Sequence, residues 1–193
     1  PAKVTVTPAG SSQSVETTFS YDSVGRRTAI VDPSAGSRTT AYTDNADGTS
    51  SVASTGPNGT VTTHYDRYGR VSGISRPEFN TTFTYGTSST CSSYGKLLSE
   101  ISTYGTARTY TYDNLGRGIT ETEYADADNW LRKTYGYGEG SNVVSVGYSN
   151  GDGAITTESF EYANGHNAAV TASQGNGITV WRKTAENVLG QPM

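Results

Sequence analysis

The chain has 193 residues, of which 33% are hydrophobic and 17% charged, and its formal net charge is −4. A net negative charge with no run of basic residues argues against nucleic acid and anionic membrane as partners. No apolar stretch reaches the roughly 18 residues of a transmembrane helix. The first residues show no signal-peptide pattern. We therefore expect no nucleic-acid partner and no membrane insertion.

The low hydrophobic content needs an explanation other than disorder. Disordered chains are usually poor in aromatic residues and highly charged, whereas this chain has 14 Tyr and few charges. The composition predicts an all-β protein, stabilised by aromatic and β-branched cross-strand pairs rather than by a thick core.

The predicted elements are β-hairpins that follow one another along the chain. A leading strand at residues 3–7 either pairs with the first hairpin or completes a unit further upstream. Each later unit has an ascending strand, a turn rich in Gly, Asn or Asp, and a return strand. The predicted units span residues 17–33, 40–53, 60–77, 83–98, 106–124, 135–146 and 160–170, and an eighth begins at Gly177 and ends with 187–191.

Several of these units depart from the common pattern at their turns, including the sixth, whose turn is predicted at 138–142. In the second unit the turn is predicted at 44–48, one residue longer than the others. In the fourth, Gly86 stands where Asp is expected, and a polar insertion follows at 87–93. In the seventh, the turn is predicted at 164–165.

Aromatic residues mark the ascending strands. Five units carry two aromatic residues two positions apart, which places both rings on one face of a strand. These pairs are Phe19/Tyr21, Phe83/Tyr85, Tyr110/Tyr112, Tyr135/Tyr137 and Phe160/Tyr162. With Tyr42 and Tyr65 added, the second members recur every 20–27 residues. This period fits one two-stranded hairpin with its connections.

Three units share the phrase Tyr-Asp-x-x-Gly-Arg. Its copies are Tyr21, Asp22, Gly25, Arg26; Tyr65, Asp66, Gly69, Arg70; and Tyr112, Asp113, Gly116, Arg117. Asp at the first turn position accepts backbone N–H groups, and Gly at the last tolerates a positive φ. The arginines are expected to pair with a carboxylate of their own or the adjacent hairpin.

These motifs resemble the YD repeats of the Rhs/YD-repeat family, which includes bacterial Rhs proteins, the B and C components of Tc insecticidal toxins, and the YD shell of teneurins. The resemblance covers essentially the whole chain. It implies tandem hairpins in one curved, twisted antiparallel sheet, a segment of a larger spiral shell. We interpret residues 1–193 as a single repeat array of about seven to eight hairpins and as a fragment of a longer protein.

The resemblance also implies a function. We expect a non-catalytic structural segment of a secreted or surface-displayed bacterial protein, whose shell encloses a C-terminal effector or toxin. Its partners would be the flanking repeats of the parent chain and the enclosed polypeptide. No cofactor is expected. The alternative function is a cell-surface adhesion or carbohydrate-binding module, with glycans as partners.

Catalytic and metal sites have little support in the sequence. The recurrent carboxylates lie one per turn, which does not match the paired carboxylates of a glycosidase. The two histidines, His64 and His166, are far apart with no ligand spacing for zinc. Residues 44–48 miss the register of a calcium loop. We predict no catalytic residue and no metal site.

Two tryptophans lie outside the aromatic pairs. Trp130 and Trp181 are the candidates for stacking on sugar rings, because an aromatic ring with a polar surround suits the apolar face of a pyranose. They carry the alternative, carbohydrate-binding interpretation.

Overall fold

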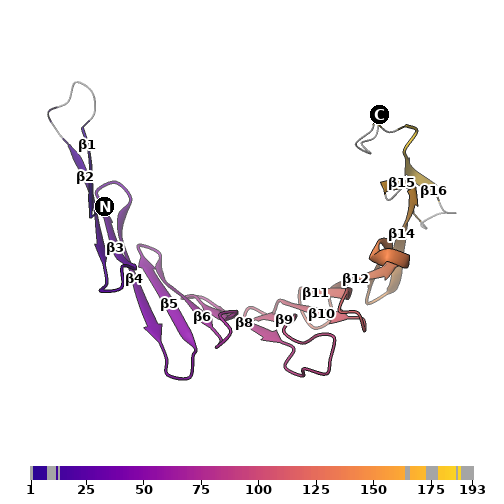
Figure 1. Cartoon of the computed structure of the whole chain (residues 1–193), viewed down its shortest axis with the longest axis horizontal. Helices are drawn as coiled ribbons and strands as arrows, with labels where there is room; N and C mark the ends of the chain where they lie inside the picture. The colour runs from indigo at the N-terminus through magenta and orange to yellow at the C-terminus, as the bar shows by residue number, and fades with distance from the viewer. Residues whose placement is uncertain are drawn as a thin grey trace. The chain divides into compact units, whose positions relative to one another are not determined.

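The computed structural model describes residues 2–7, 12, 14–163, 166–172, 178–185 and 187, and these residues form an all-β fold. The order of the sixteen strands in the sheet is their order in the sequence (Figure 1). Within the described residues, β1 pairs only with β2 and β16 only with β15, so the sheet is open. The predicted fold class, sequential hairpins in an antiparallel sheet, is confirmed.

The chain divides into two compact units, Pro1–Phe83 and Thr84–Met193, and β8 (Asn80–Tyr85) contains the boundary. The other strands of the first unit are β1 (Lys3–Val6), β2 (Val15–Tyr21), β3 (Arg27–Asp32), β4 (Gly36–Asp44), β5 (Ser50–Gly56), β6 (Gly59–Tyr65) and β7 (Val71–Ser75). The leading strand β1 pairs with β2. Of the two predicted arrangements, this is the one in which the leading strand pairs with the first hairpin.

The second unit continues the same pattern. Its strands are β9 (Leu97–Ser102), β10 (Ala107–Tyr112), β11 (Gly118–Tyr124), β12 (Trp130–Tyr137), β13 (Val143–Asn150), β14 (Gly153–Ala163), β15 (His166–Ala172) and β16 (Ile178–Arg182). A short 3-10 turn, η1 (Glu139–Ser141), connects β12 to β13. The assignment of residues 1–193 to a single array stays a prediction.

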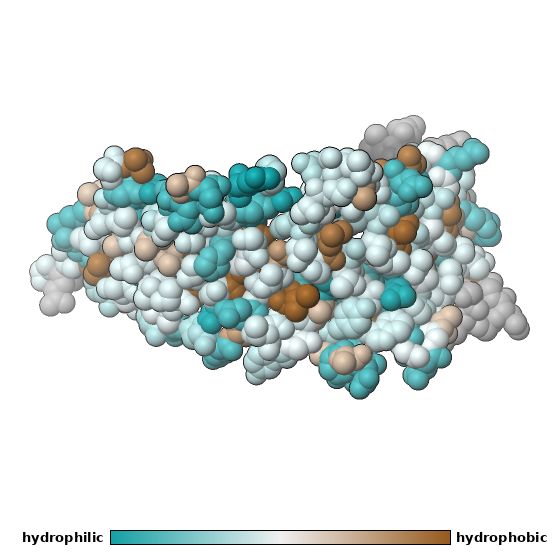
Figure 2. Space-filling view, turned by 90° about the horizontal axis from the view of Figure 1, so that it is seen from below, coloured by the Kyte–Doolittle hydropathy of each residue, from teal (hydrophilic) through white to brown (hydrophobic). Residues whose placement is uncertain are grey.

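The sheet has almost no buried core. Among the described residues, the buried apolar side chains are Val146 and Ala169, and the buried polar ones are Thr81 and Thr122. On the face seen in Figure 2, hydrophobic residues are scattered among polar ones. With little apolar burial, stability has to come from the backbone ladders and from contacts between neighbouring side chains.

A β-bulge recurs beside the second aromatic residue of the motif. In the consensus hairpin, Tyr112 lies opposite Gly118 while Thr111 lies opposite Thr120, so Ile119 is the extra residue of the return strand. The same register shift occurs beside the corresponding tyrosines, at Tyr21, Tyr65, Tyr137 and Tyr162. A bulge bends its strand and increases the local twist.

The prediction of a longer turn in the second hairpin is wrong. Asp44 is the last residue of β4, and the turn begins at Asn45. The Asn45 N–H donates to Thr49 O over 2.9 Å, and the Gly48 N–H donates to Asn45 O over 3.0 Å. This turn therefore has the length of the others. The pattern misled because Asp44 resembles the motif aspartate, whereas Asn45 takes that place.

Part of the predicted C-terminal organisation falls on residues that the structure does not describe. The turn at 164–165, the start of the eighth unit at Gly177 and most of its motif-like end at 187–191 lie outside the described residues. Strand β16 within that unit is described.

Candidate functional site

The turn of the Tyr-Asp-x-x-Gly-Arg motif is closed by its aspartate. In the consensus hairpin, Asp113 Oδ1 accepts the N–H groups of Leu115 and Arg117, both at 2.9 Å. Asp113 Oδ2 accepts from Arg117 Nε at 2.6 Å. The Gly116 N–H donates to Asp113 O over 2.9 Å, and Gly116 has φ +78°. One carboxylate thus holds two backbone donors and the motif arginine.

The other two copies repeat this arrangement. Asp22 accepts from the N–H groups of Val24 and Arg26 and from Arg26 Nε at 2.7 Å. Asp66 holds the N–H groups of Tyr68 and Arg70 and accepts from Arg70 Nε, also at 2.7 Å. The turn glycines Gly25 and Gly69 have φ +84° and +75°. The motif aspartates and glycines therefore act locally, within their own hairpins.

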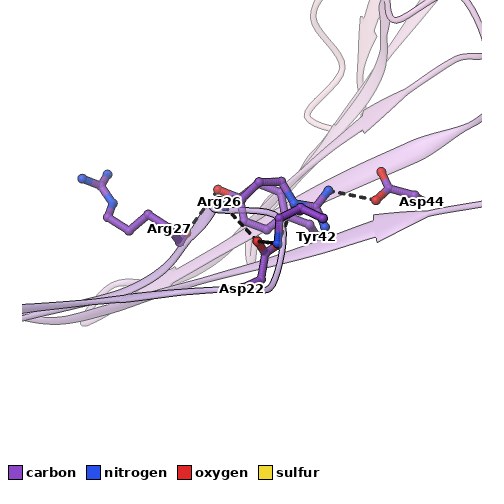
Figure 3. A network of polar contacts seen from close by, with 6 residues as sticks. Asp22, Arg26, Arg27, Tyr42 and Asp44 are labelled. Carbon is purple, nitrogen blue, oxygen red and sulfur yellow. Dashed lines mark hydrogen bonds and ion pairs between the residues drawn. The ribbon is translucent and has the colours of Figure 1, made fainter. Parts of the chain in front are cut away.

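The motif arginine also reaches the next hairpin. The Arg26 guanidinium lies 4.4 Å from the centre of the Tyr42 ring, and its Nη1 donates to Asp44 Oδ2 at 2.8 Å (Figure 3). The Tyr42 hydroxyl donates to Arg27 O at 3.1 Å. Arg26 is thus bonded to Asp22 of its own hairpin and to two residues of the following one. We call this set of contacts between consecutive hairpins the Arg–Tyr clasp.

The clasp recurs in the second unit. Arg117 lies 4.4 Å from the Tyr137 ring, whose hydroxyl donates to Gly118 O at 2.7 Å. Lys96 takes the arginine place against Tyr112, with its Nζ 5.1 Å from the ring. Two further tyrosine hydroxyls donate to the first residue of the return strand in the preceding hairpin. Tyr112 donates to Leu97 O and Tyr162 to Val143 O, both at 2.7 Å.

The sequence predicts that the motif arginine pairs with a carboxylate of its own or the adjacent hairpin, and Arg26 pairs with both Asp22 and Asp44. The contact of the arginine with a tyrosine ring, and the bond from the tyrosine hydroxyl to the preceding hairpin, were not predicted. A signal was present in the spacing, because the basic residue precedes its partner tyrosine by 16 positions at Arg26 and Tyr42 and by 20 at Arg117 and Tyr137. That signal is weak without the strand register.

The insertion in the fourth hairpin leaves the turn bonds intact. The Gly86 N–H donates to Lys96 O over 3.0 Å, and the Gly95 N–H donates to Gly86 O over 2.9 Å. These are the two bonds that Asp113 makes with Arg117 and Gly116 in the consensus copy. Gly86 and Lys96 therefore occupy the Asp and Arg places, and the extra residues form a loop between them.

Because of the motif carboxylates, the stability of the fold depends on pH in the acid range. The hydrogen bond from the Arg26 side chain holds the pKa of Asp22 below its ordinary value. These bonds therefore stabilise the fold above the ordinary carboxyl pKa of about 4, and they are lost as the pH falls through the lowered pKa. We expect the urea midpoint to drop between pH 5 and pH 2 by less in Asp22→Asn than in the parent chain. An equal drop in both would contradict this role.

The other candidate sites do not assemble among the described residues. No group of three or more metal-ligating side chains comes together there. His64 Nε2 lies 3.3 Å from Ser75 Oγ, and the side chain of His166 is outside the described part. In residues 44–48, which miss the register of a calcium loop, Asp44 pairs with Arg26, and Asp47 accepts from Thr49. Within the described chain, no helix has the length and apolar content to cross a membrane.

One groove lies in the second unit, and Trp130 lines it. The groove has a volume of about 750 Å³. Its other lining residues come from strands β9 to β13 and their connections: Glu100, Ser102, Thr106, Ala107, Arg108, Glu123, Tyr124, Ala125, Asp128, Asn129, Leu131, Asn150, Gly151 and Asp152. Trp181 lies on β16, where 38% of its surface is exposed, and does not line the groove. Of the two candidate tryptophans, Trp130 therefore belongs to the groove and Trp181 does not.

The chain resembles solved structures but matches neither family models nor curated proteins. It is similar to the crystal structure of TcdB2-TccC3-Cdc42, with a TM-score of 0.61 and 14% identity over 92% of this chain. Crystal structures of TcdB2-TccC3 and TcdB2-TccC3-TEV each give a TM-score of 0.60, at 15% and 14% identity over 88% of this chain.

In each of these comparisons the chain spans 10% of the length of the matched protein. At such low sequence identity, the likeness concerns the arrangement of the strands and not the activity. The chain has the sequential β-hairpin fold of a segment of TcdB2-TccC3, which is the fold implied by its resemblance to the YD-repeat family.

Proposed function

We propose that this chain is a non-catalytic wall segment of a larger YD-repeat shell that encloses a polypeptide. The observation that carries the proposal is the Arg–Tyr clasp. It joins each of several hairpins to the next by the same contacts, so the array extends by adding units rather than by closing around a core. A long wall needs such a repeating connection.

The distribution of charged groups supports the same function. The three motif aspartates are bonded to the arginines and backbone of their own turns. A carboxylate used as a general acid or nucleophile would instead have to face a substrate. We therefore assign the three motif aspartates a role in the stability of the fold. We further propose that the parent protein is secreted or displayed on a bacterial surface, as the family resemblance implies.

The proposal is tested on the full-length parent protein. Electron microscopy is expected to show closed, hollow particles, and a protease added to the intact particles should leave the enclosed polypeptide uncut. The same polypeptide should be cut after denaturation, which is the control for its cleavability. Open rods, or rapid cleavage in the intact particles, would overturn the wall function.

The alternative function, a carbohydrate-binding module, has support at one place. Trp130 is one of the lining residues of a groove that also has amide, hydroxyl and carboxylate groups, and the volume of about 750 Å³ lies in the range of small-molecule sites. Trp181 does not line this groove.

A further inference from the structure

The two faces of the sheet differ in charge across β9 to β13. Residues opposite each other in a ladder share a face, and so do residues two apart in a strand. These strands contain six charged residues, and the register places five of them on one face: Glu100, Arg108, Glu121, Glu123 and Lys133. The sixth, Arg132, is opposite Thr122 and Ser149 and lies on the other face. Arg132 is therefore the single charged side chain that β9 to β13 place on that face.

Two neighbours on the same face hold the Arg132 side chain in place. Its Nε donates to Thr122 Oγ1 over 3.0 Å, and its guanidinium lies 5.0 Å from the centre of the Trp130 ring. Thr122 is buried, with 2% of its surface exposed, whereas Trp130 and Arg132 are half-buried. These contacts order the side chain before any partner binds, so binding costs little additional side-chain entropy.

The charge of Arg132 has no compensating carboxylate among the described residues. The ion pairs of that part of the chain all involve other basic residues. On the opposite face, by contrast, Arg108 Nη2 lies 2.8 Å from Glu123 Oε1, and Lys133 Nζ lies 3.9 Å from Glu121 Oε2. A guanidinium that is partly withdrawn from water loses hydration, and an opposite charge offsets that loss. For Arg132, this opposite charge has to come from outside the described chain.

The remaining edge of the Arg132 guanidinium has the geometry of a carboxylate site. Because Nε is bonded to Thr122, the two Nη atoms form the edge that remains, and they have no hydrogen-bond partner among the described residues. Two parallel N–H groups on one edge pair with both oxygens of a carboxylate. One guanidinium supplies one positive charge, which matches a carboxylate, whereas a phosphoryl dianion is usually held by a cluster of arginines.

The surroundings of Arg132 are neutral and partly aromatic. Trp130 is opposite Tyr124 in the ladder of β11 and β12, and Arg132 is opposite Ser149 in the ladder of β12 and β13. Trp, Tyr and Arg are enriched at the centres of protein interfaces, where other charged residues are depleted. The composition of this face is therefore that of a surface for a polypeptide.

We propose that Arg132 and Trp130 form a docking site for an acidic segment of a polypeptide partner. A Glu or Asp carboxylate of the partner pairs with both Nη atoms of Arg132, and an adjoining apolar side chain packs against Trp130 and Tyr124. The carboxylate supplies the negative charge that the described residues of this chain do not. The site is independent of the wall function, because its residues lie in the second unit and take no part in the Arg–Tyr clasp.

The test is an NMR titration of the 193-residue chain with the peptide acetyl-Gly-Leu-Glu-Leu-Gly-amide. The Arg132 Nε–H signal is expected to shift and to saturate. The matched peptide with Gln in place of Glu should bind at least about tenfold more weakly, since it lacks the charge that strengthens the hydrogen bonds. No saturable shift with the Glu peptide, or equal affinity for the Gln peptide, would overturn the proposal. Binding of the corresponding phosphoserine peptide at least about tenfold more tightly than the Glu peptide would overturn the carboxylate assignment.

Variants locate the binding at Arg132, with the indole N–H signal of Trp130 as the readout. Arg132→Gln removes the charge and is expected to weaken binding of the Glu peptide about tenfold or more. Arg132→Lys keeps the charge but loses the two-pronged edge, so it should also bind more weakly than the parent chain. Lys133→Gln is the matched control, because Lys133 is the next residue but lies on the opposite face, and it should bind as the parent chain does.

The two Arg132 variants together keep the proposal open to contradiction. Arg132→Lys retains a positive charge beside Trp130, so it tests the site even if Arg132→Gln unfolds. Affinity equal to that of the parent chain in Arg132→Lys, or in an Arg132→Gln chain shown to be folded by circular dichroism, would contradict the docking site. An equal loss of affinity in Lys133→Gln would place the binding on the other face and would contradict it as well.

Discussion

The Gly86→Ala substitution is expected to lower the free energy of unfolding by about 1–3 kcal/mol, the usual effect of overpacking. A Cβ atom at residue 86 would lie 2.2 Å from the backbone oxygen of Ser93 and 2.7 Å from its carbonyl carbon. These are backbone atoms of the inserted loop, so a side-chain rotation cannot relieve the clash. Thermal denaturation measures the effect, at about 2–4 °C for each kcal/mol in a chain of this size.

Gly118→Ala is the matched control. Gly118 also lies beside a motif turn, but a Cβ atom there would have no other atom within 4 Å, and its φ is not in the positive region that disfavours side chains. Gly118→Ala should therefore melt close to the parent chain. Equal melting temperatures for Gly86→Ala and the parent would show that the inserted loop does not pack on residue 86.

The same geometry predicts an unusual result for a consensus change. Gly86 occupies the place of the motif aspartate, so Gly86→Asp restores the common sequence of the repeat. We expect it to destabilise at least as much as Gly86→Ala, because the added Cβ meets the same backbone atoms. The departure from the motif at this position is thus required by the loop that follows it.

Tyr137→Ala is expected to destabilise the chain by about 2 kcal/mol or more. Tyr137 is half-buried, its ring lies 4.4 Å from the Arg117 guanidinium, and its hydroxyl donates to Gly118 O. Truncation removes the ring packing, the cation–π contact and the hydrogen bond between two hairpins together. Urea denaturation measures the loss.

Two further variants separate these contributions. Tyr137→Phe keeps the ring and removes only the hydroxyl, so it should lose about 1 kcal/mol, the net value of one hydrogen bond. Tyr104→Ala removes a tyrosine that is 76% exposed and should have a small effect. If Tyr137→Ala were no more destabilising than Tyr104→Ala, the Arg–Tyr clasp would not be a stabilising connection.

Much of the fold was predictable because short-range chemistry governs a hairpin. The spacing Asp113-x-x-Gly116 predicts a turn in which the carboxylate accepts nearby N–H groups and the glycine adopts a positive φ, and both features are present. Alternation of aromatic residues predicts the strands. The sequence could not place the second turn, since Asp44 and Asn45 are both good turn residues and only the strand register decides between them.

The candidate site was less accessible to sequence reasoning. Trp130 and Trp181 are equivalent as isolated tryptophans in a polar sequence, yet Trp130 lines the groove of the second unit and Trp181 does not. The carboxylates of that groove come from three hairpins that are separate in the sequence. Their meeting depends on the register between hairpins, and no local pattern contains that register.

The sequence by itself thus determined the hairpin unit, its turn chemistry and the succession of units, because each depends on residues only a few positions apart. The tertiary structure alone decided which tyrosine meets which arginine, why Gly86 replaces an aspartate, and where Trp130 gains polar neighbours. These features depend on contacts between separate strands and loops, and the geometry of those contacts is set by the strand register, by local bulges and by an insertion.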